Sequence, residues 1–327
     1  MTAKPIKTIG VFSSGGDAPG MNAAIRSVVR TAHYEGFNVI GIYGGYKGLL
    51  DENFKSLGPR SVANIIQRGG TILKSGRFLE FHEENIRKKA VNILNHHGID
   101  ALIGIGGNGT LAGLKALHDE SHFPVIGLPG TIDNDIYGTD ITIGFDTAVN
   151  TALEAIDRIR DTATSHDRLF IVEVMGHSAG HLALQVGLAG GAEEIFVPET
   201  QGAIEQTIHR IEQSVRSGKL ASLLVIAEGY KGGGAYDLAK MLQEKLNLEA
   251  RVCILGHIQR GGTPTAFDRT LASRLGAHGI KLVKTQTFGI MAGWTAGKEC
   301  SVTLDQCLKE NKTLNRDTLE LARILST

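Results

Sequence analysis

The chain lacks the features that mark several large classes of protein. Its 3 cysteines among 327 residues are too few and too scattered for a disulfide framework or a zinc site. No apolar run approaches the roughly 20 residues of a membrane-spanning helix, and residues 1–10 contain no apolar signal core. We therefore expect a cytoplasmic protein that has no membrane partner.

An excess of charge of either sign is also missing. The chain has 34 Lys and Arg residues against 34 Asp and Glu residues. No net field therefore attracts nucleic acid or an anionic membrane surface. We expect no nucleic-acid partner, and we expect basic side chains to act locally.

Glycine is the residue in excess. The chain has 42 glycines, well above the usual fraction of about 7%. Many of them stand in pairs, several of them just after apolar runs, as at residues 15–16, 44–45 and 106–107. Such loops expose backbone N–H groups that can bind anions, although helix caps and tight turns are the simpler interpretation of each pair alone.

Short β-branched runs alternate with amphipathic stretches along the chain, which predicts parallel sheets with helices on both faces. The predicted strands are residues 8–12, 39–43, 101–105, 125–128, 170–174, 194–197, 223–227 and 252–255. The predicted helices are residues 22–34, 83–96, 111–119, 147–162, 181–189, 202–215, 237–245 and 267–282. These are more strands than one compact sheet needs. We therefore expect two similar three-layer α/β domains with mainly parallel sheets, divided near Gly138, and an active-site cleft between them.

The loop Pro-Gly-Thr-Ile-Asp-Asn-Asp at residues 129–135 offers the most chemistry. It follows the apolar run 125–128, and open α/β sheets bind their ligands at the carboxyl ends of strands. Thr131, Asp133 and Asp135 can orient a substrate alcohol, take its proton and help to place a metal. Taken alone, the same composition is also typical of a plain turn.

Two glycine loops each lead into a predicted helix. Residues 13–22 match neither a Walker A motif nor a dinucleotide fingerprint, but a glycine turn at a helix N-terminus suits a phosphate chain. Residues 106–110 read Gly-Gly-Asn-Gly-Thr, where Asn108 can offer an oxygen to a cation. Phosphoryl transfer requires positioned anions, a metal and a base, so the three loops together favour it.

Five blocks of the sequence resemble the signature blocks of bacterial 6-phosphofructokinases, in that family's order and over nearly the whole chain. They are residues 14–22, 106–110, 129–135, 173–176 and 255–262. The resemblance implies glycolytic phosphorylation of fructose 6-phosphate by ATP to give fructose 1,6-bisphosphate. It further implies Mg²⁺ and a cytoplasmic homotetramer. Residues 1–138 and 258–304 would form the larger, nucleotide-binding domain, and residues 139–257 and 305–327 the smaller, sugar-phosphate-binding domain.

The resemblance also assigns roles to individual positions. Asp133 is the expected general base, supported by Thr131 and Asp135, and His177 is the fourth expected catalytic residue. The nucleotide would contact Gly16, Tyr46, Arg77, Phe78, Gly107, Asn108, Gly109 and Thr110. The sugar phosphate would contact Thr131, Asp133, Asp135, Met175, Gly176, His177, Glu228, His257 and Arg260, with Arg168 and Arg251 supplied across a subunit interface. An effector nucleotide would bind Arg26, Arg30, Arg160, Glu193 and Lys219, although Pro59 and Ser217 replace two basic residues of that pocket.

Two positions depart from the family pattern. Asn108 stands where the family has a metal-holding Asp, and an amide brings no charge to a hard dication. His177 stands where the family usually has an Arg near the transferred group. One hypothesis is that the two changes compensate each other, because together they leave the charge of the site nearly unchanged.

These departures leave two alternatives to a working ATP-dependent kinase. One is a weakly active or non-catalytic sensor that retains the binding loops. The other is a kinase that uses pyrophosphate or another sugar. Pyrophosphate-dependent relatives carry Asp at the position of Gly109 and Lys at the position of Gly130, so the two glycines favour ATP.

Overall fold

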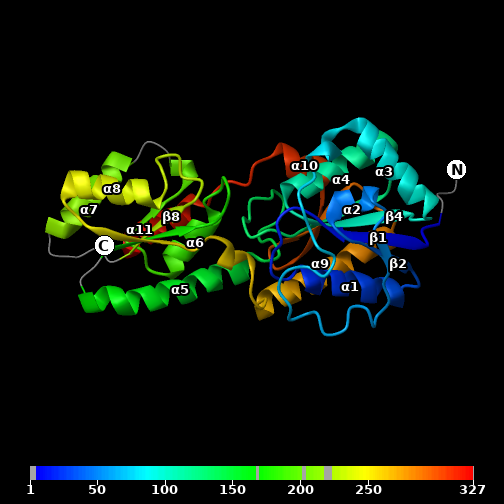
Figure 1. The fold of residues 1–327 in the computed structure, drawn as a ribbon, viewed down its shortest axis with the longest axis horizontal. Helices are drawn as coiled ribbons and strands as arrows, with labels where there is room; N and C mark the ends of the chain where they lie inside the picture. The colour runs from blue at the N-terminus through cyan, green and yellow to red at the C-terminus, as the bar shows by residue number, and fades with distance from the viewer. Residues whose placement is uncertain (1–4, 167–168, 201–203, 217–222, 327) are drawn as a thin grey trace. The chain divides into compact units, whose positions relative to one another are not determined.

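The computed structural model describes residues 5–166, 169–200, 204–216 and 223–326 (Figure 1). The chain divides into unit 1, residues 1–147 and 260–312, and unit 2, residues 148–259 and 313–327. The sequence placed its first division at Gly138, in a loop. In the structure the first division falls instead within the first turn of helix α5 (Phe145–His166).

Unit 1 is built on a sheet of 7 strands in the order β11-β10-β5-β4-β1-β2-β3. The strands from β10 to β2 run parallel, and β11 and β3 close the two edges in antiparallel pairs. The bounds are β1 (Thr8–Ser13), β2 (Asn38–Ile42), β3 (Phe54–Ser56), β4 (Ala101–Gly106), β5 (Val125–Pro129), β10 (Ile290–Thr295) and β11 (Lys298–Thr303). Strands β4 and β5 are buried throughout, as expected for central strands covered on both faces.

Helices cover both faces of this sheet (Figure 1). Helices α1 (Met21–Tyr34) and α9 (Ala266–Lys284) pack together on one face. The other face carries α2 (Gly45–Leu50), α3 (Glu84–His96), α4 (Asn108–Ser121) and α10 (Leu304–Lys309). A short 3₁₀ helix, Leu79–His82, precedes α3.

Unit 2 has a sheet of 4 parallel strands in the order β7-β8-β6-β9. Its strands are β6 (Leu169–Val174), β7 (Glu194–Phe196), β8 (Leu223–Ala227) and β9 (Ala250–Ile254). Helices α7 (Ile204–Arg216) and α8 (Ala235–Leu246) cover one face, and α5 and α6 (His181–Ala189) cover the other (Figure 1). Helix α11 (Arg316–Leu325) packs on α6.

The predicted strands and helices are all present, with ends displaced by a few residues. The sequence did not predict β3, β10, β11, α2, α10 or α11. Strands β10 and β11 pair as a hairpin around the turn at Ala296 and Gly297. Their residues mix glycine, cysteine and charged side chains, so they lack a continuous β-branched run. Among the described residues, no helix is long and apolar enough to cross a membrane.

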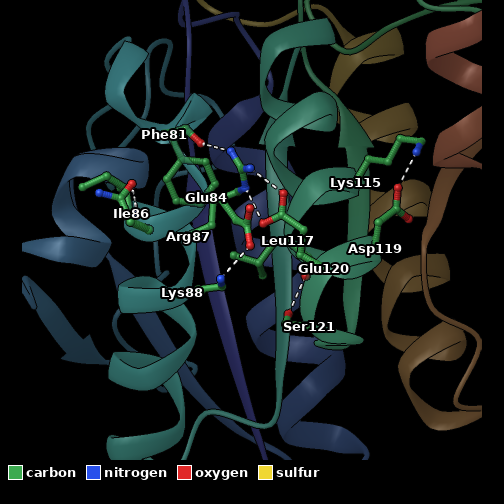
Figure 2. A network of polar contacts seen from close by, with 11 residues as sticks. Phe81, Glu84, Ile86, Arg87, Lys88, Lys115, Leu117, Asp119, Glu120 and Ser121 are labelled. Carbon is green, nitrogen blue, oxygen red and sulfur yellow. Dashed lines mark hydrogen bonds and ion pairs between the residues drawn. The ribbon is translucent and has the colours of Figure 1, made fainter.

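A buried arginine joins α3 to α4 (Figure 2). Arg87, which is 8% exposed, donates through Nε to Glu120 Oε2 at 2.8 Å and through Nη1 to Phe81 O at 2.7 Å. Its Nη2 also pairs with Glu120 Oε1. Both ends of this contact are charged and hydrogen-bonded, which makes removal of one partner costly. The clamp therefore fixes Phe81 relative to the end of α4.

A buried carboxylate anchors the segment that leads into α5. Asp268, in the first turn of α9 and 0% exposed, accepts from Gly144 N and Thr147 N at 2.8 Å and from Thr147 Oγ1 at 2.5 Å. Burial raises the pKa of Asp268 to about 6, and these hydrogen bonds oppose the rise. Asp268 therefore holds together two segments that are more than 100 residues apart in sequence.

We expect Asp268→Asn to destabilise the protein. Both carboxylate oxygens of Asp268 accept hydrogen bonds, whereas asparagine has one acceptor oxygen and an NH2 group that can only donate. The raised pKa gives native Asp268 a stabilising contribution at acid pH that declines as the pH rises from about 4 to 6. The difference in unfolding free energy between wild type and variant should therefore narrow by about 1 kcal/mol from pH 5 to pH 7. Urea unfolding at both pH values measures it, with exposed Asp51→Asn as the control. A difference in unfolding free energy between wild type and Asp268→Asn that does not change with pH would contradict the raised pKa of Asp268.

Candidate active site

Three loops of unit 1 meet at one edge of the sheet. They follow β1, β4 and β5, which are neighbouring parallel strands. Ser13 lies opposite Ile105, and Gly106 lies opposite Pro129. The carboxyl ends of the three strands are therefore level, and the loops at residues 13–16, 106–110 and 129–135 lie beside one another.

Hydrogen bonds connect these loops directly. Ser14 N donates to Ile105 O at 3.1 Å, and Gly130 N donates to Gly106 O at 3.0 Å. Thr110 Oγ1 donates to Ser14 O at 3.1 Å. The three predicted motifs therefore form one continuous surface, with the N-terminus of α4 in its middle.

The loop at residues 129–135, called the acid loop below, bends at Asn134. This residue has φ +52°, is 6% exposed and has both ends of its amide bonded. Its Nδ2 donates to Asp140 O at 3.3 Å, and its Oδ1 accepts from Thr142 N at 3.1 Å. Asp133 and Asp135 flank this bend and are half-buried. Asp133 N also donates to Thr131 Oγ1 at 3.2 Å, so Thr131 fixes the backbone that carries the predicted base.

The unusual Asn108 contacts the acid loop. Its Nδ2 donates to Asp135 Oδ2 at 2.8 Å from the first residue of α4. The amide thereby brings a carboxylate close to a helix N-terminus, where negative charge is favoured. A carboxylate at position 108 would instead oppose Asp135 at this distance.

Among the described residues, the site offers oxygen ligands for a metal ion but no preformed cluster of acidic ligands. No group of three or more His, Cys, Asp or Glu side chains that could hold a metal occurs among the described residues. The donors at hand are the Asn108 amide and the Asp135 carboxylate, which lie side by side. Hard oxygen donors suit Mg²⁺, which needs only one or two protein ligands and keeps several waters.

The predicted nucleotide residues take different positions around this surface. Tyr46 is 4% exposed, and its ring stacks on Phe81 with centroids 3.9 Å apart. Its hydroxyl donates to Thr110 O at 2.6 Å, and burial raises its pKa. Tyr46 thus supports the 106–110 loop from the core. Arg77 is exposed and Phe78 is half-buried; both follow Gly76, whose carbonyl accepts from Gly15 N at 3.2 Å.

Arg260 belongs to unit 1 and lies against the first glycine loop. Its guanidinium fills the space beside Gly16, where an added Cβ would lie 2.1 Å from Arg260 Nη1. Arg260 was predicted from the resemblance as a sugar-phosphate contact. In unit 1 its described neighbours are Gly16 and Asp17.

A second set of predicted residues meets at the strand ends of unit 2. Met175, Gly176 and His177 follow β6, and Glu228 follows the neighbouring β8. His177 N donates to Glu228 Oε1 at 2.7 Å, and Glu228 N donates to Val174 O at 2.9 Å. The carboxylate therefore holds the turn at His177, which has φ +53°.

The other predicted residues are more dispersed. His257 and Arg251 are exposed, and Arg251 pairs with Glu249 at 2.9 Å. Of the effector set, Arg26 is half-buried and Arg30 exposed on α1 in unit 1. In unit 2, Arg160 Nε donates to Gly190 O at 3.2 Å, and Glu193 Oε2 accepts from Leu223 N at 2.8 Å. Arg168 and Lys219 lie outside the described residues.

Several residues that shape these loops were not singled out from the sequence. Gln259 is 0% exposed and accepts through Oε1 from Met175 N at 2.9 Å. Asn134 bends the acid loop, and Lys312 donates to it at 2.8 Å. Gln259 and Asn134 lie inside the blocks 255–262 and 129–135, so their position in the sequence could have indicated a role in shaping the site. Lys312 stands in a polar stretch that gives no signal of its own.

The chain is similar to known proteins over nearly its whole length. Residues 8–283 match the family model described as Phosphofructokinase. ATP-dependent 6-phosphofructokinase 1 of Thermus thermophilus is 55% identical over 98% of this chain and 100% of that protein. ATP-dependent 6-phosphofructokinase of Clostridioides difficile is 50% identical over the same shares. Pichia pastoris phosphofructokinase in the T-state is 32% identical, with TM-score 0.87 over 98% of this chain, which spans 36% of that longer chain.

The turn at His177 predicts a sensitive glycine. A Cβ on Gly229 would lie 2.1 Å from the backbone oxygen of His177, and a backbone contact cannot be relieved by rotating a side chain. We expect Gly229→Ala to shift this turn and to destabilise the protein by about 1–3 kcal/mol. Thermal unfolding measures the effect. Gly58→Ala, where nothing lies within 4 Å of the added Cβ, is the matched control and should change the midpoint little. Equal midpoints for the two variants would refute the steric argument.

Proposed function

The chain belongs to the phosphofructokinase family, and we infer that it is an ATP-dependent 6-phosphofructokinase. It transfers the terminal phosphoryl group of ATP to the 1-hydroxyl of fructose 6-phosphate, giving fructose 1,6-bisphosphate and ADP. The observation that carries this conclusion is the junction of the three loops. Two glycine loops at neighbouring strand ends and a helix N-terminus adjoin a loop that presents two carboxylates.

Asp133 is the proposed general base. It accepts the proton of the sugar hydroxyl as the oxygen attacks the terminal phosphorus, and the bond from that phosphorus to the ADP oxygen breaks. Phosphoryl transfer relies mainly on positioning and on stabilisation of charge. The hydrogen bond from Asp133 N to Thr131 Oγ1 and the bend at Asn134 supply that positioning for the base.

ATP is proposed to bind along the first two loops. The N-terminus of α4 directs N–H groups and the positive end of its dipole toward the phosphates. Gly107 and Gly109 keep side chains away from this approach, and nothing lies within 4 Å of the space beside Gly109. Thr110 acts by bonding the second loop to Ser14 of the first.

Mg²⁺ would be held by the Asn108 amide oxygen and the Asp135 carboxylate, whose side chains are hydrogen-bonded to each other at the start of α4. When bound, the ion supplies charge neutralisation for the transferred phosphoryl group. The donors fit the ion in kind. Because Asn108 is uncharged, we propose that this enzyme depends more on Asp135 and on the nucleotide phosphates to hold the ion.

The sugar phosphate is proposed to contact Met175, Gly176, His177, Glu228, His257 and Arg260. Glu228 can accept from sugar hydroxyls through the oxygen that does not bind His177 N. We keep Arg168 and Arg251 as contacts supplied by a neighbouring subunit of a homotetramer. We also keep the effector nucleotide at Arg26, Arg30, Arg160, Glu193 and Lys219, and a cytoplasmic location, where sugar phosphates and ATP are found.

The donor preference has physical support at Gly130. A Cβ there would lie 3.0 Å from Ile105 Cγ2 and 3.2 Å from Met21 Cε, so any side chain at this buried position would have to displace Ile105 and Met21. The relatives at 50% and 55% identity are named as ATP-dependent enzymes. The sensor and the pyrophosphate-dependent kinase are therefore not favoured.

We expect Asp133→Asn to lower kcat by about 100- to 10,000-fold, which is the usual contribution of a general base. Binding of ATP should persist, because the glycine loops are unchanged. A coupled assay with fructose 6-phosphate and Mg²⁺ measures turnover with ATP and, separately, with pyrophosphate. Exposed Asp51→Asn is the control and should keep wild-type turnover. Wild-type protein that turns over with pyrophosphate but not with ATP, or with neither, would overturn the proposed function.

Asn108→Asp tests the metal assignment. Without Mg²⁺ this variant should be less stable than wild type by about 1 kcal/mol, because it loses a hydrogen bond to Asp135 and opposes its charge. Millimolar Mg²⁺ should restore the thermal midpoint of this variant and leave that of Asn108→Ala unchanged. Thermal unfolding with and without Mg²⁺ compares the three proteins. The assignment fails if Mg²⁺ shifts Asn108→Asp and Asn108→Ala equally.

A further inference from the structure

Lys312, at the C-terminal end of unit 1, contacts the acid loop and the residues that follow it. It lies in the segment between α10 and α11 and is the last residue of unit 1. Its Nζ donates to Asn134 Oδ1 at 2.8 Å and to Asp140 O at 2.8 Å. An ammonium group has three N–H donors. Two of them bond to the segment that carries and follows the proposed base.

The bonded partner of Lys312 is the residue that bends the loop. Asn134 has a left-handed backbone, φ +52°, and is buried. Its Oδ1 accepts from Thr142 N and from Lys312, and its Nδ2 donates to Asp140 O. Asp140 O is in turn the second acceptor of Lys312. The lysine thus closes a small polar network around the one residue that separates Asp133 from Asp135.

Lys312 carries its positive charge near two carboxylates, those of Asp140 and Asp135. Burial lowers the pKa of Lys312 to about 8, and the carboxylates of Asp140 and Asp135 oppose this fall. At neutral pH the amino group is therefore mostly protonated and can donate both hydrogen bonds. A hydrogen bond from a charged donor to a buried amide is stronger than a neutral one.

The adjoining backbone is held independently of the lysine. Asp140 N donates to Trp294 O at 2.7 Å, and Trp294 N donates to Thr139 Oγ1 at 3.0 Å. The Asp140 side chain also accepts from Ala296 N at 2.8 Å. Residues 139–140 are thereby fixed to the β10–β11 hairpin. Removal of the amino group should leave this attachment in place and affect mainly the bend at Asn134.

We infer that Lys312 is a positioning residue for the phosphoryl transfer, which acts through Asn134 to set the direction of the Asp133 carboxylate. The inference rests on the proposed function. Lys312 touches no reacting atom in this role, since its described hydrogen bonds go to the loop. Its removal should therefore lower the rate of the chemical step more than the affinity for either substrate.

The test compares Lys312→Met with wild type. Methionine keeps most of the apolar stem and removes the charge and both hydrogen bonds. The matched control is Lys309→Met, at an exposed lysine three positions earlier that pairs with Asp305 at 2.7 Å. Steady-state kinetics with ATP and with fructose 6-phosphate give kcat and both KM values, and thermal unfolding confirms that each protein is folded. A displacement of the base by about 1 Å can cost about 100-fold, so we expect kcat of Lys312→Met to fall by about 10- to 100-fold. Both KM values should stay within about twofold of wild type.

A double-mutant cycle with Asn134→Ala shows whether the lysine acts through Asn134. If it does, Lys312→Met should have little further effect on kcat in the Asn134→Ala background. Should Asn134→Ala fail to fold, the division between kcat and KM decides alone. The inference is overturned by a Lys312→Met enzyme with wild-type kcat, by a loss seen mainly in KM, or by effects that multiply in the double variant. Inactive wild-type and Lys309→Met proteins would instead reject the proposed function itself.

Discussion

The site depends on the parallel pairing of β1, β4 and β5. Because these strands run in the same direction and in level register, three separate segments end at one edge of the sheet. The hydrogen bonds from Gly130 N to Gly106 O and from Thr110 Oγ1 to Ser14 O then join the loops to one another. Without this adjacency, the glycine turns and the carboxylates would be unrelated surface loops.

Buried polar side chains keep these loops in place from behind. Tyr46 bonds to the 106–110 loop, and its ring rests on Phe81, whose carbonyl is held by Arg87. Arg87 is bonded in turn to Glu120 at the other end of α4. Both the beginning and the end of α4 are therefore tied to the same support. The position of the N-terminus of this helix therefore depends on the side chains packed around α4 as well as on the 106–110 loop.

The sequence predicted the strands and the loops because β-branched runs, glycine pairs and acidic turn residues are local patterns. It could not predict the partners of individual side chains. Asn108 was interpreted as a weakened metal ligand, and its hydrogen bond to Asp135 depends on where two loops meet in space. Lys312 gave no signal because a lone lysine in a polar stretch usually faces solvent. The first division between the units lies inside the continuous helix α5, where composition does not change and gives no signal of a boundary.

The contact between Lys312 and Asn134 joins residues 178 positions apart. During synthesis, the acid loop and strands β1, β4 and β5 leave the ribosome long before the lysine is made. Synthesis proceeds at roughly 5–20 residues per second, so about 10 to 35 seconds separate the synthesis of Asn134 from that of Lys312. The complete hydrogen-bond network of the acid loop therefore forms only after residue 312 has been translated, and a chain released before that residue lacks the network.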